Sequence, residues 1–312
     1  MLHLTLRQLQ IFDAVARHLS FSRASGEMHL SQPAVSMQVK QLEEAVGIPL
    51  FEQIGKKIFL TDAGREVQRA SQAIQQQLVD LENTLIDIRG VKGGSLTVGV
   101  VSTASYFAAR LMAQFRQQRP DVKLTLNVVN RETLLNQLAN NETDLAIMGQ
   151  PPTGRDLEAR AFMANPLVLI APPGHVLAME KRMSFTRLAN EPMLAREVGS
   201  GTRNAMEGVF HEHDLSLRPA MEMNKNEAIK QAVEVGLGLG VVSLHTVEHE
   251  LRTGRLITLD VDGFPILRHW NLVHRQGKRL SPAAQAFRDY VLEEGARMGA
   301  QFAITGDGVA VA

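Results

Sequence analysis

The sequence predicts a multidomain α/β protein in which a small helical domain is followed by one long helix and then by a two-lobed α/β domain. Three observations predict this class. Apolar residues at helical spacing dominate residues 1–60. One uninterrupted helical pattern then runs from Thr61 to about Arg89. In the rest of the 312-residue chain, strand-like and helical stretches alternate, as they do in a parallel sheet covered by helices.

Composition excludes several classes of protein. The chain has no cysteine, which excludes disulfides, thiol catalysis and cysteine-ligated zinc. It opens with no secretion signal and contains no run of about 18 apolar residues, so we expect a cytoplasmic protein that makes no contact with a membrane. The formal net charge of +0 argues against a uniformly basic surface but permits a local basic patch that binds nucleic acid.

Four short elements are predicted before the long helix. Apolar spacing predicts a first helix over residues 6–19. Ser22 is the predicted cap of a second helix that ends at Met28, and Ser31 is the predicted cap of a third helix, whose first turn tolerates a proline. Two apolar stretches within residues 49–61 predict a small hairpin with a basic tip.

The third helix has the features of a helix that reads DNA. A short helix, a tight turn and a third helix form a helix-turn-helix, whose last helix enters the major groove. Gln32 can pair with adenine, and Ala34 can contact a thymine methyl group. The alternative is a protein–protein module with solvated polar residues, and the basic hairpin directly after the helix favours DNA. The predicted DNA-contacting residues are Ser22, Ser31, Gln32, Pro33, Ala34, Ser36, Met37, Lys40, Lys56 and Lys57.

The long helix carries a repeating apolar row that is typical of a coiled-coil seam. The alternative is a helix packed only on its own domain, but its other faces are mostly polar and offer little else to bury. We therefore expect the helix to pair with a second copy of the chain. The apolar row consists of Val67, Ile74, Leu78, Leu81, Leu85 and Ile88.

The alternating part of the chain begins after a predicted break, "RGVKGG", at residues 89–94. Strands such as "SLTVGVV" and "VKLTLNVV" alternate with helices in a first lobe, and the pattern repeats in a second lobe. The strand "RHWNLVH" and the helix from Pro282 to about Met298 are predicted to return to the first lobe.

The N-terminal stretch "LRQLQIFDAVARHLSFSRASGEMHLSQPAVSMQVKQLEEAVGIPLFEQIGKKIFLTDAGR" resembles the winged helix-turn-helix of LysR-type transcriptional regulators. Three further stretches, "NRETLLNQLANNETDLAIMGQPP", "GSGTR" and "NEAIKQAVEVGLGLGVVSLHTVEHELRTGRL", are similar to the CbbR type, which controls carbon-fixation operons. The resemblance implies a winged helix-turn-helix domain at 1–60, a dimerising linker helix at 61–90, a periplasmic-binding-protein-like effector domain at 91–302 and a tail at 303–312. Within the effector domain it implies a lobe I of about 91–164 and 266–302 and a lobe II of about 165–265.

The resemblance also implies the partners. It implies a DNA-binding regulator that catalyses no reaction, needs no cofactor or metal, and responds to a small anionic metabolite held between the two effector lobes. Double-stranded promoter DNA, the effector, further copies of the chain in a dimer and tetramer, and RNA polymerase are the expected partners.

Two helix starts, one in each lobe, carry the residues expected to hold the effector. Ser102 and Thr103 follow a strand, and "GSGTR" begins a helix of the other lobe, where free backbone N–H groups favour an anion. The alternative is that these residues only cap their helices. The predicted effector-binding residues are Ser102, Thr103, Ser105, Arg131, Gln150, Gly201, Thr202, Arg203, Asn226 and Glu227.

Two of these positions depart from the CbbR type. The resemblance implies Lys where this chain has Ser105 and Arg where it has Gln150. With Arg203 and Arg131 as the fixed charges near the cleft, the sequence predicts an anion of modest charge, because uncompensated charge is costly to remove from water.

Two other functions are alternatives to a DNA-binding regulator. The stretch "HTVEH", His245 to His249, fits the H-x-x-E-H pattern of a zinc-dependent hydrolase. That function needs a third ligand and a long helix, whereas the flanking sequence is predicted to be a buried strand, so solvated histidines are preferred. A cytosolic solute-binding protein of the same two-lobed fold would not explain residues 1–90.

Overall fold

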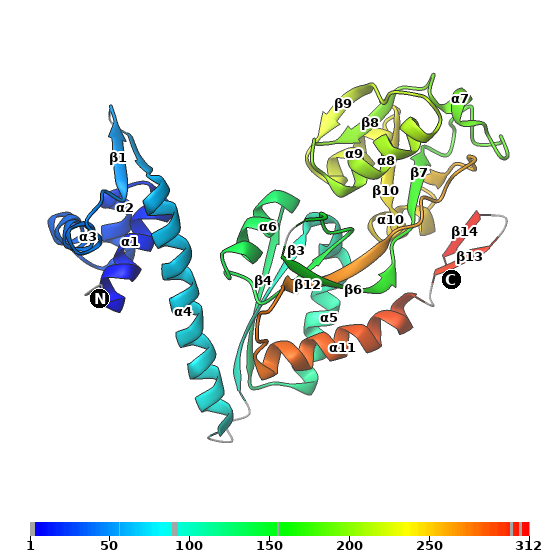
Figure 1. Cartoon of the computed structure of the whole chain (residues 1–312). Helices are drawn as coiled ribbons and strands as arrows, with labels where there is room; N and C mark the ends of the chain where they lie inside the picture. Colours follow the sequence, from blue (N-terminus) through cyan, green and yellow to red (C-terminus); the bar gives the residue numbers. More distant parts are fainter. Residues whose placement is uncertain are drawn as a thin grey trace. The chain divides into compact units, whose positions relative to one another are not determined.

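The structure, a computed structural model shown in Figure 1, divides the chain into two compact units. The units are Met1–Ile88 and Arg89–Ala312. Most of the predicted break between them, residues 89–92, lies outside the part of the chain that the structure describes. The described residues are 4–55, 57–88, 93–154, 156–299, 302–305 and 308–311.

The first unit contains the three predicted helices, the hairpin and the long helix. Its elements are α1 (Leu6–His18), α2 (Phe21–Met28), α3 (Gln32–Val46), β1 (Phe51–Ile54), β2 (Lys57–Leu60) and α4 (Asp62–Ile88). Strands β1 and β2 pair antiparallel. Ser31 caps α3 as predicted, because its Oγ accepts a hydrogen bond from the N–H of Ala34 at 3.4 Å.

One predicted cap is wrong. Helix α2 is capped by Ser20, whose Oγ accepts from the N–H of Arg23 at 3.3 Å, and not by Ser22. Leu19 adopts the left-handed conformation, with φ of 46°, at the end of α1. The second helix therefore begins two residues earlier than predicted, and Ser22 already lies in the first turn of α2.

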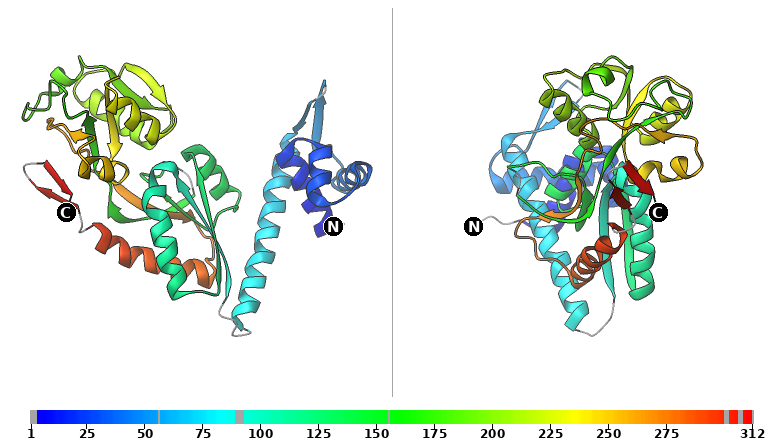
Figure 2. Two further views of the ribbon diagram at one scale, coloured as in Figure 1. Left: turned by 180° about the vertical axis from the view of Figure 1, so that it is seen from behind. Right: turned by 90° about the vertical axis from the view of Figure 1, so that its right-hand side faces the viewer.

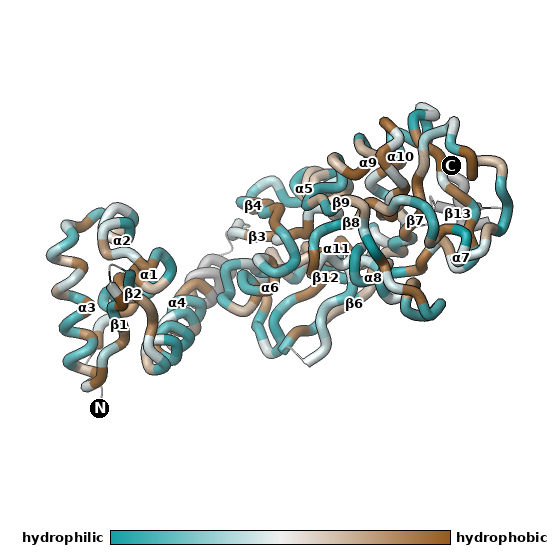
Figure 3. The backbone as a smooth tube through the Cα atoms, turned by 90° about the horizontal axis from the view of Figure 1, so that it is seen from above, coloured by the Kyte–Doolittle hydropathy of each residue, from teal (hydrophilic) through white to brown (hydrophobic). Residues whose placement is uncertain are grey.

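The buried face of α3 anchors the helix to the rest of the first unit. Val35, Val39 and Leu42 are buried, as the spacing predicts, and Val35 and Val39 share a core with Ile11 of α1. Leu42 packs in an adjoining core with Phe12. This arrangement turns the opposite face of α3 outward, and Figure 3 shows hydrophobic and hydrophilic segments alternating along α3 and α4.

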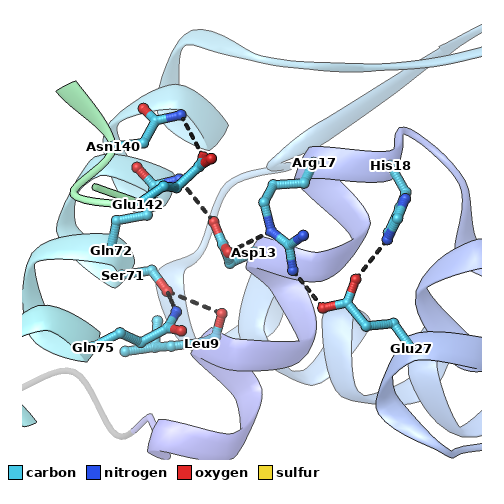
Figure 4. Close-up of polar contacts among 10 residues, drawn as sticks. All are labelled: Leu9, Asp13, Arg17, His18, Glu27, Ser71, Gln72, Gln75, Asn140 and Glu142. Atoms are coloured by element: carbon cyan, nitrogen blue, oxygen red, sulfur yellow. Dashed lines mark hydrogen bonds and ion pairs between the residues drawn. The ribbon is translucent and has the colours of Figure 1, made fainter. Parts of the chain in front are cut away.

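A polar network joins the first half of α4 to α1, and α1 to α2 (Figure 4). The buried carboxylate of Asp13 accepts hydrogen bonds from Arg17 Nε at 3.1 Å and from Gln72 Nε2 at 3.0 Å. Arg17 also contacts Glu27 of α2 at 2.5 Å, and the buried Ser71 hydroxyl donates to a carbonyl of α1 at 3.0 Å. Because each of these buried polar groups has a partner, the start of α4 is held firmly on the helical domain.

The second unit consists of two lobes, each built on a five-stranded sheet (Figure 2). The sheet of the first lobe has the order β4-β3-β5-β12-β6, in which β3 is parallel to β4 and β5, and β12 is antiparallel to its neighbours. The elements of this lobe are β3 (Gly94–Val101), η1 (Ser102–Ala104), α5 (Ser105–Gln118), β4 (Val122–Val129), α6 (Arg131–Ala139), β5 (Leu145–Met148), β6 (Leu157–Ala164), β12 (His269–Arg275) and α11 (Pro282–Gly299).

The sheet of the second lobe has the order β11-β7-β10-β8-β9 and is also mixed. The chain enters this lobe between β6 and β7 and returns between β11 and β12, so that β12 and α11 complete the first lobe as predicted. The elements are β7 (Leu167–Ala171), α7 (Phe185–Leu188), β8 (Met193–Arg196), α8 (Gly201–Glu212), β9 (Pro219–Met223), α9 (Asn226–Glu234), β10 (Leu239–Ser243), α10 (Leu244–Arg252) and β11 (Ile257–Thr258).

Sequence reasoning missed β6, α7, α10 and β11. The expectation of a buried strand around "HTVEH" is wrong, because strand β10 ends at Ser243 and helix α10 begins at once. Leu244 and Val247 are fully buried, and Leu251 packs beside them, a spacing of three and four residues that places them on one face of a helix.

The C-terminal residues form an antiparallel hairpin of β13 (Phe302–Thr305) and β14 (Gly308–Val311), where the sequence predicts a tail at 303–312. Among the described residues, no helix has both the length and the apolar composition that a membrane crossing requires.

Candidate DNA-reading surface and effector cavity

The outward face of α3 carries five of the ten residues predicted to contact DNA. Gln32, Ser36 and Lys40 recur every fourth residue and are exposed, which places them in one row along the helix. Pro33 and Met37 form a neighbouring exposed row, with Met37 54% exposed. Such a surface offers hydrogen-bonding, apolar and cationic groups to a groove of DNA.

The remaining predicted DNA contacts surround this helix face. Ser31 caps the helix and is exposed, and Ala34 behind it is half-buried. Ser22 is exposed in the first turn of α2, and Lys57 is exposed at the start of β2. The first turn of α3 contains no acidic residue, so its positive helix end is available to a phosphate. Lys56 lies outside the described residues.

Helix α4 exposes large apolar side chains beyond the part that is fixed to the helical domain. Ile74, Leu81 and Leu85 of the predicted row are 38%, 53% and 43% exposed, whereas Val67 and Leu78 are half-buried. The side chain of Ile88 lies outside the described part. A row of exposed leucines on a long helix is costly in water unless a partner covers it.

A cavity of about 230 Å³ lies between the two lobes of the second unit. Residues at the carboxyl ends of β3 and β5 form one wall, and the start of α8 forms another. In α/β folds ligands bind at such strand ends. Six of the ten predicted effector-binding residues line it: Ser102, Thr103, Arg131, Gln150, Gly201 and Thr202.

The second-lobe wall is the start of α8, where the side chain of the cap residue does not hydrogen-bond to the helix. Ser200 occupies the cap position of α8, yet its side chain makes no capping hydrogen bond, and it lines the cavity together with Thr202. On the first-lobe wall Arg131 begins α6, and its Nη2 donates to the carbonyl of Gln150 at 3.2 Å. Hydroxyl and guanidinium donors therefore face the cavity from both lobes.

Two predicted effector-binding residues are engaged elsewhere. The hydroxyl of Ser105 donates to the carbonyl of Ser102 at 2.6 Å and stabilises the start of α5. Arg203 forms ion pairs with Glu207 at 2.7 Å and with Glu222 at 2.6 Å. The hydrogen bond to Glu207 raises the pKa of Arg203, and its charge is compensated within the second lobe.

The other two, Asn226 and Glu227, join the lobes beside the cavity. Asn226 Nδ2 donates to Thr103 Oγ1 at 3.1 Å, and Glu227 accepts a hydrogen bond from the Tyr106 hydroxyl of the first lobe. Burial and the nearby carboxylate of Glu227 raise the pKa of Tyr106, which keeps the phenol protonated as a donor. Glu227 also pairs with the buried Lys230 at 2.8 Å, so the contact is anchored in the second lobe.

Two arginines that sequence reasoning missed line the cavity. Arg196, at the end of β8, is only 4% exposed, and Arg268 precedes β12. With Arg131, three guanidinium groups and one carboxylate, that of Glu197, belong to the described lining, and Glu197 pairs with Arg196 at 2.7 Å. The predicted charge count, based on Arg203 and Arg131, is therefore wrong.

A sequence signal for one of these arginines exists. Arg196 directly follows the buried strand "MLA", at the carboxyl end where α/β sheets bind ligands. Arg268 lies in the return crossing between the lobes, and no local pattern marks it. Two buried N–H groups of lining residues, Arg268 Nε and Trp270 Nε1, have no acceptor among the described protein atoms.

The histidines of "HTVEH" do not share one environment. His245 is buried against the rings of Phe107 and Trp270, and its Nε2 is 2.9 Å from the carbonyl oxygen of Ala164. Burial lowers the pKa of His245 and keeps it neutral. His249 is exposed, and no cluster of three metal-ligating side chains is found among the described residues. Nothing in this geometry favours a zinc-dependent hydrolase.

Comparison with known families decides the identity of the fold. The LysR substrate binding domain matches residues 89–296, and the bacterial regulatory helix-turn-helix protein, lysR family, matches residues 6–65. The chain belongs to the LysR family of transcriptional regulators. This membership confirms the predicted winged helix-turn-helix and two-lobed α/β effector architecture.

Relatives within the LysR family confirm the CbbR-like prediction. The chain is 57% identical to the RuBisCO operon transcriptional regulator of Allochromatium vinosum, over 95% of this chain and 98% of that protein. It is 46% identical to the HTH-type transcriptional regulator CbbR of Rhodospirillum rubrum, over 90% and 93%. The structure of the Synechocystis PCC6803 CcmR regulatory domain in complex with 2-PG is similar with a TM-score of 0.63 and 41% identity, covering 66% of this chain and 99% of that one.

Proposed function

We propose that this chain regulates a carbon-fixation operon by binding promoter DNA with α3 and a small anionic metabolite in the cavity between its lobes. One observation carries the proposal: three guanidinium groups line the cavity of this chain, and they come from both lobes and from the crossing between the lobes. The chain is also 57% identical to a RuBisCO operon regulator. A group of three arginines matched by one carboxylate favours an anion.

The DNA-binding step uses the exposed face of α3. Gln32 and Ala34 are proposed to contact bases, while Lys40, Lys57 and the helix start contact phosphates. Two copies of α3 in a dimer would read an inverted repeat in successive major grooves. The exposed row of Leu81 and Leu85 on α4 is the proposed dimer seam, since pairing would bury it.

The effector step uses the hydroxyl donors and arginines of the cavity. An anion there accepts hydrogen bonds from donors on both walls. The similar CcmR domain was solved in complex with 2-PG, which supports a small metabolite as the ligand. An effector that favours one lobe arrangement shifts the arrangement of subunits in a tetramer, and with it the bend of the promoter and access of RNA polymerase.

The proposal is tested by two linked measurements on the full-length chain. Genomic fragments bound by the protein are selected and sequenced, and then inorganic phosphate, 2-PG and sugar bisphosphates are titrated by calorimetry. We expect fragments upstream of carbon-fixation genes and saturable binding of at least one anion. Enrichment of unrelated promoters would contradict the operon assignment, and the absence of any anion binding would contradict the effector assignment.

A further inference from the structure

Asn226, which sequence reasoning placed among the effector ligands, does not line the cavity. It is the first residue of α9 and is 4% exposed. Its Oδ1 accepts from Arg196 Nη1 at 2.6 Å, and its Nδ2 donates to Thr103 Oγ1 at 3.1 Å. A single buried amide thus connects an arginine of the second lobe with a hydroxyl of the first, and both of these partners line the cavity.

The direction of these two hydrogen bonds is set by chemistry. A guanidinium group has only donors, so the atom of Asn226 that faces Arg196 must be its carbonyl oxygen. The amide nitrogen then faces Thr103, and the Thr103 oxygen must accept. Among the hydrogen bonds of the described residues, none uses the Thr103 hydroxyl as a donor. Its hydrogen is therefore not taken up by a described protein acceptor, and Thr103 itself lines the cavity.

We propose that Asn226 is a positioning residue that sets the Thr103 hydroxyl as a hydrogen-bond donor to the effector. Arg196 fixes the orientation of the amide, the amide occupies an acceptor position of Thr103, and the hydroxyl hydrogen is left for an oxygen of the bound anion. The cavity thereby favours ligand groups that only accept hydrogen bonds, such as phosphate and carboxylate. This inference rests on the proposed effector function.

The hydroxyl of Ser102, next to Thr103, also accepts a hydrogen bond from the second lobe. Arg196 Nη2 contacts Ser102 Oγ at 3.4 Å, a long and weak bond that also leaves the hydrogen of that hydroxyl unused. The contact of Tyr106 with Glu227 joins the same two lobes but does not involve Thr103 or Ser102. It therefore provides a control that weakens the lobe contact without changing the direction of the donors.

The test is a double-mutant cycle measured by calorimetry on the full-length protein, with inorganic phosphate and 2-PG as probes. Asn226→Asp is nearly isosteric and still accepts from Arg196, but its carboxylate also accepts the hydroxyl hydrogen of Thr103. Its added charge weakens anion binding to the same extent whether residue 103 is Thr or Val, so the charge does not affect the comparison within the cycle. We expect Thr103→Val to weaken binding about tenfold in the wild-type background, the value of a hydrogen bond to a charged group. In the Asn226→Asp background, the same change should weaken binding less than about twofold.

Controls separate this inference from its alternatives. Thr103→Ser, which keeps the hydroxyl, should retain wild-type affinity, and Tyr106→Phe should leave the tenfold effect of Thr103→Val intact. Thermal unfolding and operator binding verify that each variant is folded. An equal effect of Thr103→Val in both backgrounds would overturn the inference while the effector function stands. A wild-type protein that binds neither probe would overturn the effector function for these anions, and this inference with it.

Discussion

Replacing Arg268 by glutamine should weaken anion binding by about tenfold to a hundredfold. Arg268 lines the cavity, its Nη1 donates to Gln150 Oε1 at 3.0 Å, and its buried Nε has no acceptor among the described atoms. Glutamine retains polarity but loses the charge and the planar fork of donors. A hydrogen bond to a charged group contributes about 1.5–3 kcal/mol, and about 1.4 kcal/mol corresponds to a factor of ten in Kd.

The assay is calorimetric titration of inorganic phosphate and 2-PG into wild-type and Arg268→Gln protein at two salt concentrations. Arg275→Gln is the matched control, because Arg275 is an exposed arginine on β12 and lies outside the cavity lining. It should bind both anions like the wild type, since exposed charges are screened by salt. An Arg268→Gln protein that is folded and has unchanged Kd for both anions would refute the assignment of this arginine to the site.

Other substitutions test the remaining surfaces. Gln32→Ala should cost about 1–3 kcal/mol of binding free energy on the specific operator and little on random DNA, whereas Lys57→Ala should weaken binding to both DNAs. Equal losses of affinity for the two DNAs in gel shifts of Gln32→Ala would remove Gln32 from the base-reading residues. The double variant Leu81→Asp, Leu85→Asp should sediment as a monomer and lose affinity for the operator. A monomer with full operator affinity would contradict the proposal that this row of α4 joins the two DNA-reading helices. Because burial lowers the pKa of His245 below its ordinary 6.5, the unfolded chain binds protons more readily. The contribution of neutral His245 to the stability of the fold should therefore be complete above pH 6.5 and should decline as the pH falls below 6.5. Thermal unfolding of His245→Gln should lack this contribution to the acid-induced decline. Identical pH profiles of the melting temperature for the two proteins would contradict the prediction.

The helical domain could be predicted almost completely because its signals are local. The caps, the proline of α3 and the apolar spacing each depend on residues within one or two turns. The one error, Ser22 in place of Ser20, arose because two serines two positions apart both suit a cap, and only the left-handed Leu19 decides between them.

The cavity could be predicted only in part because its geometry depends on long-range contacts. The hydroxyl residues at helix starts were found from local patterns, and six of the ten predicted residues line the cavity. Arg268 reaches it through the return crossing, which no local pattern reveals. Arg203 and Asn226 lie in the first turns of their helices, but neither lines the cavity. Arg203 pairs with two glutamates of its own lobe, and Asn226 bonds to Thr103 of the other lobe.

The most direct test of regulation by an anion in the cavity is a nuclease footprint on the selected promoter, with and without the tightest-binding anion, for the wild type and Arg268→Gln. Arg268 belongs to the second unit, and the DNA-reading helix α3 belongs to the first. We predict that the anion changes the length of the wild-type footprint, whereas Arg268→Gln protein binds the promoter with a footprint that the anion does not change at the same concentration. A footprint that responds equally to the anion in both proteins would contradict the account.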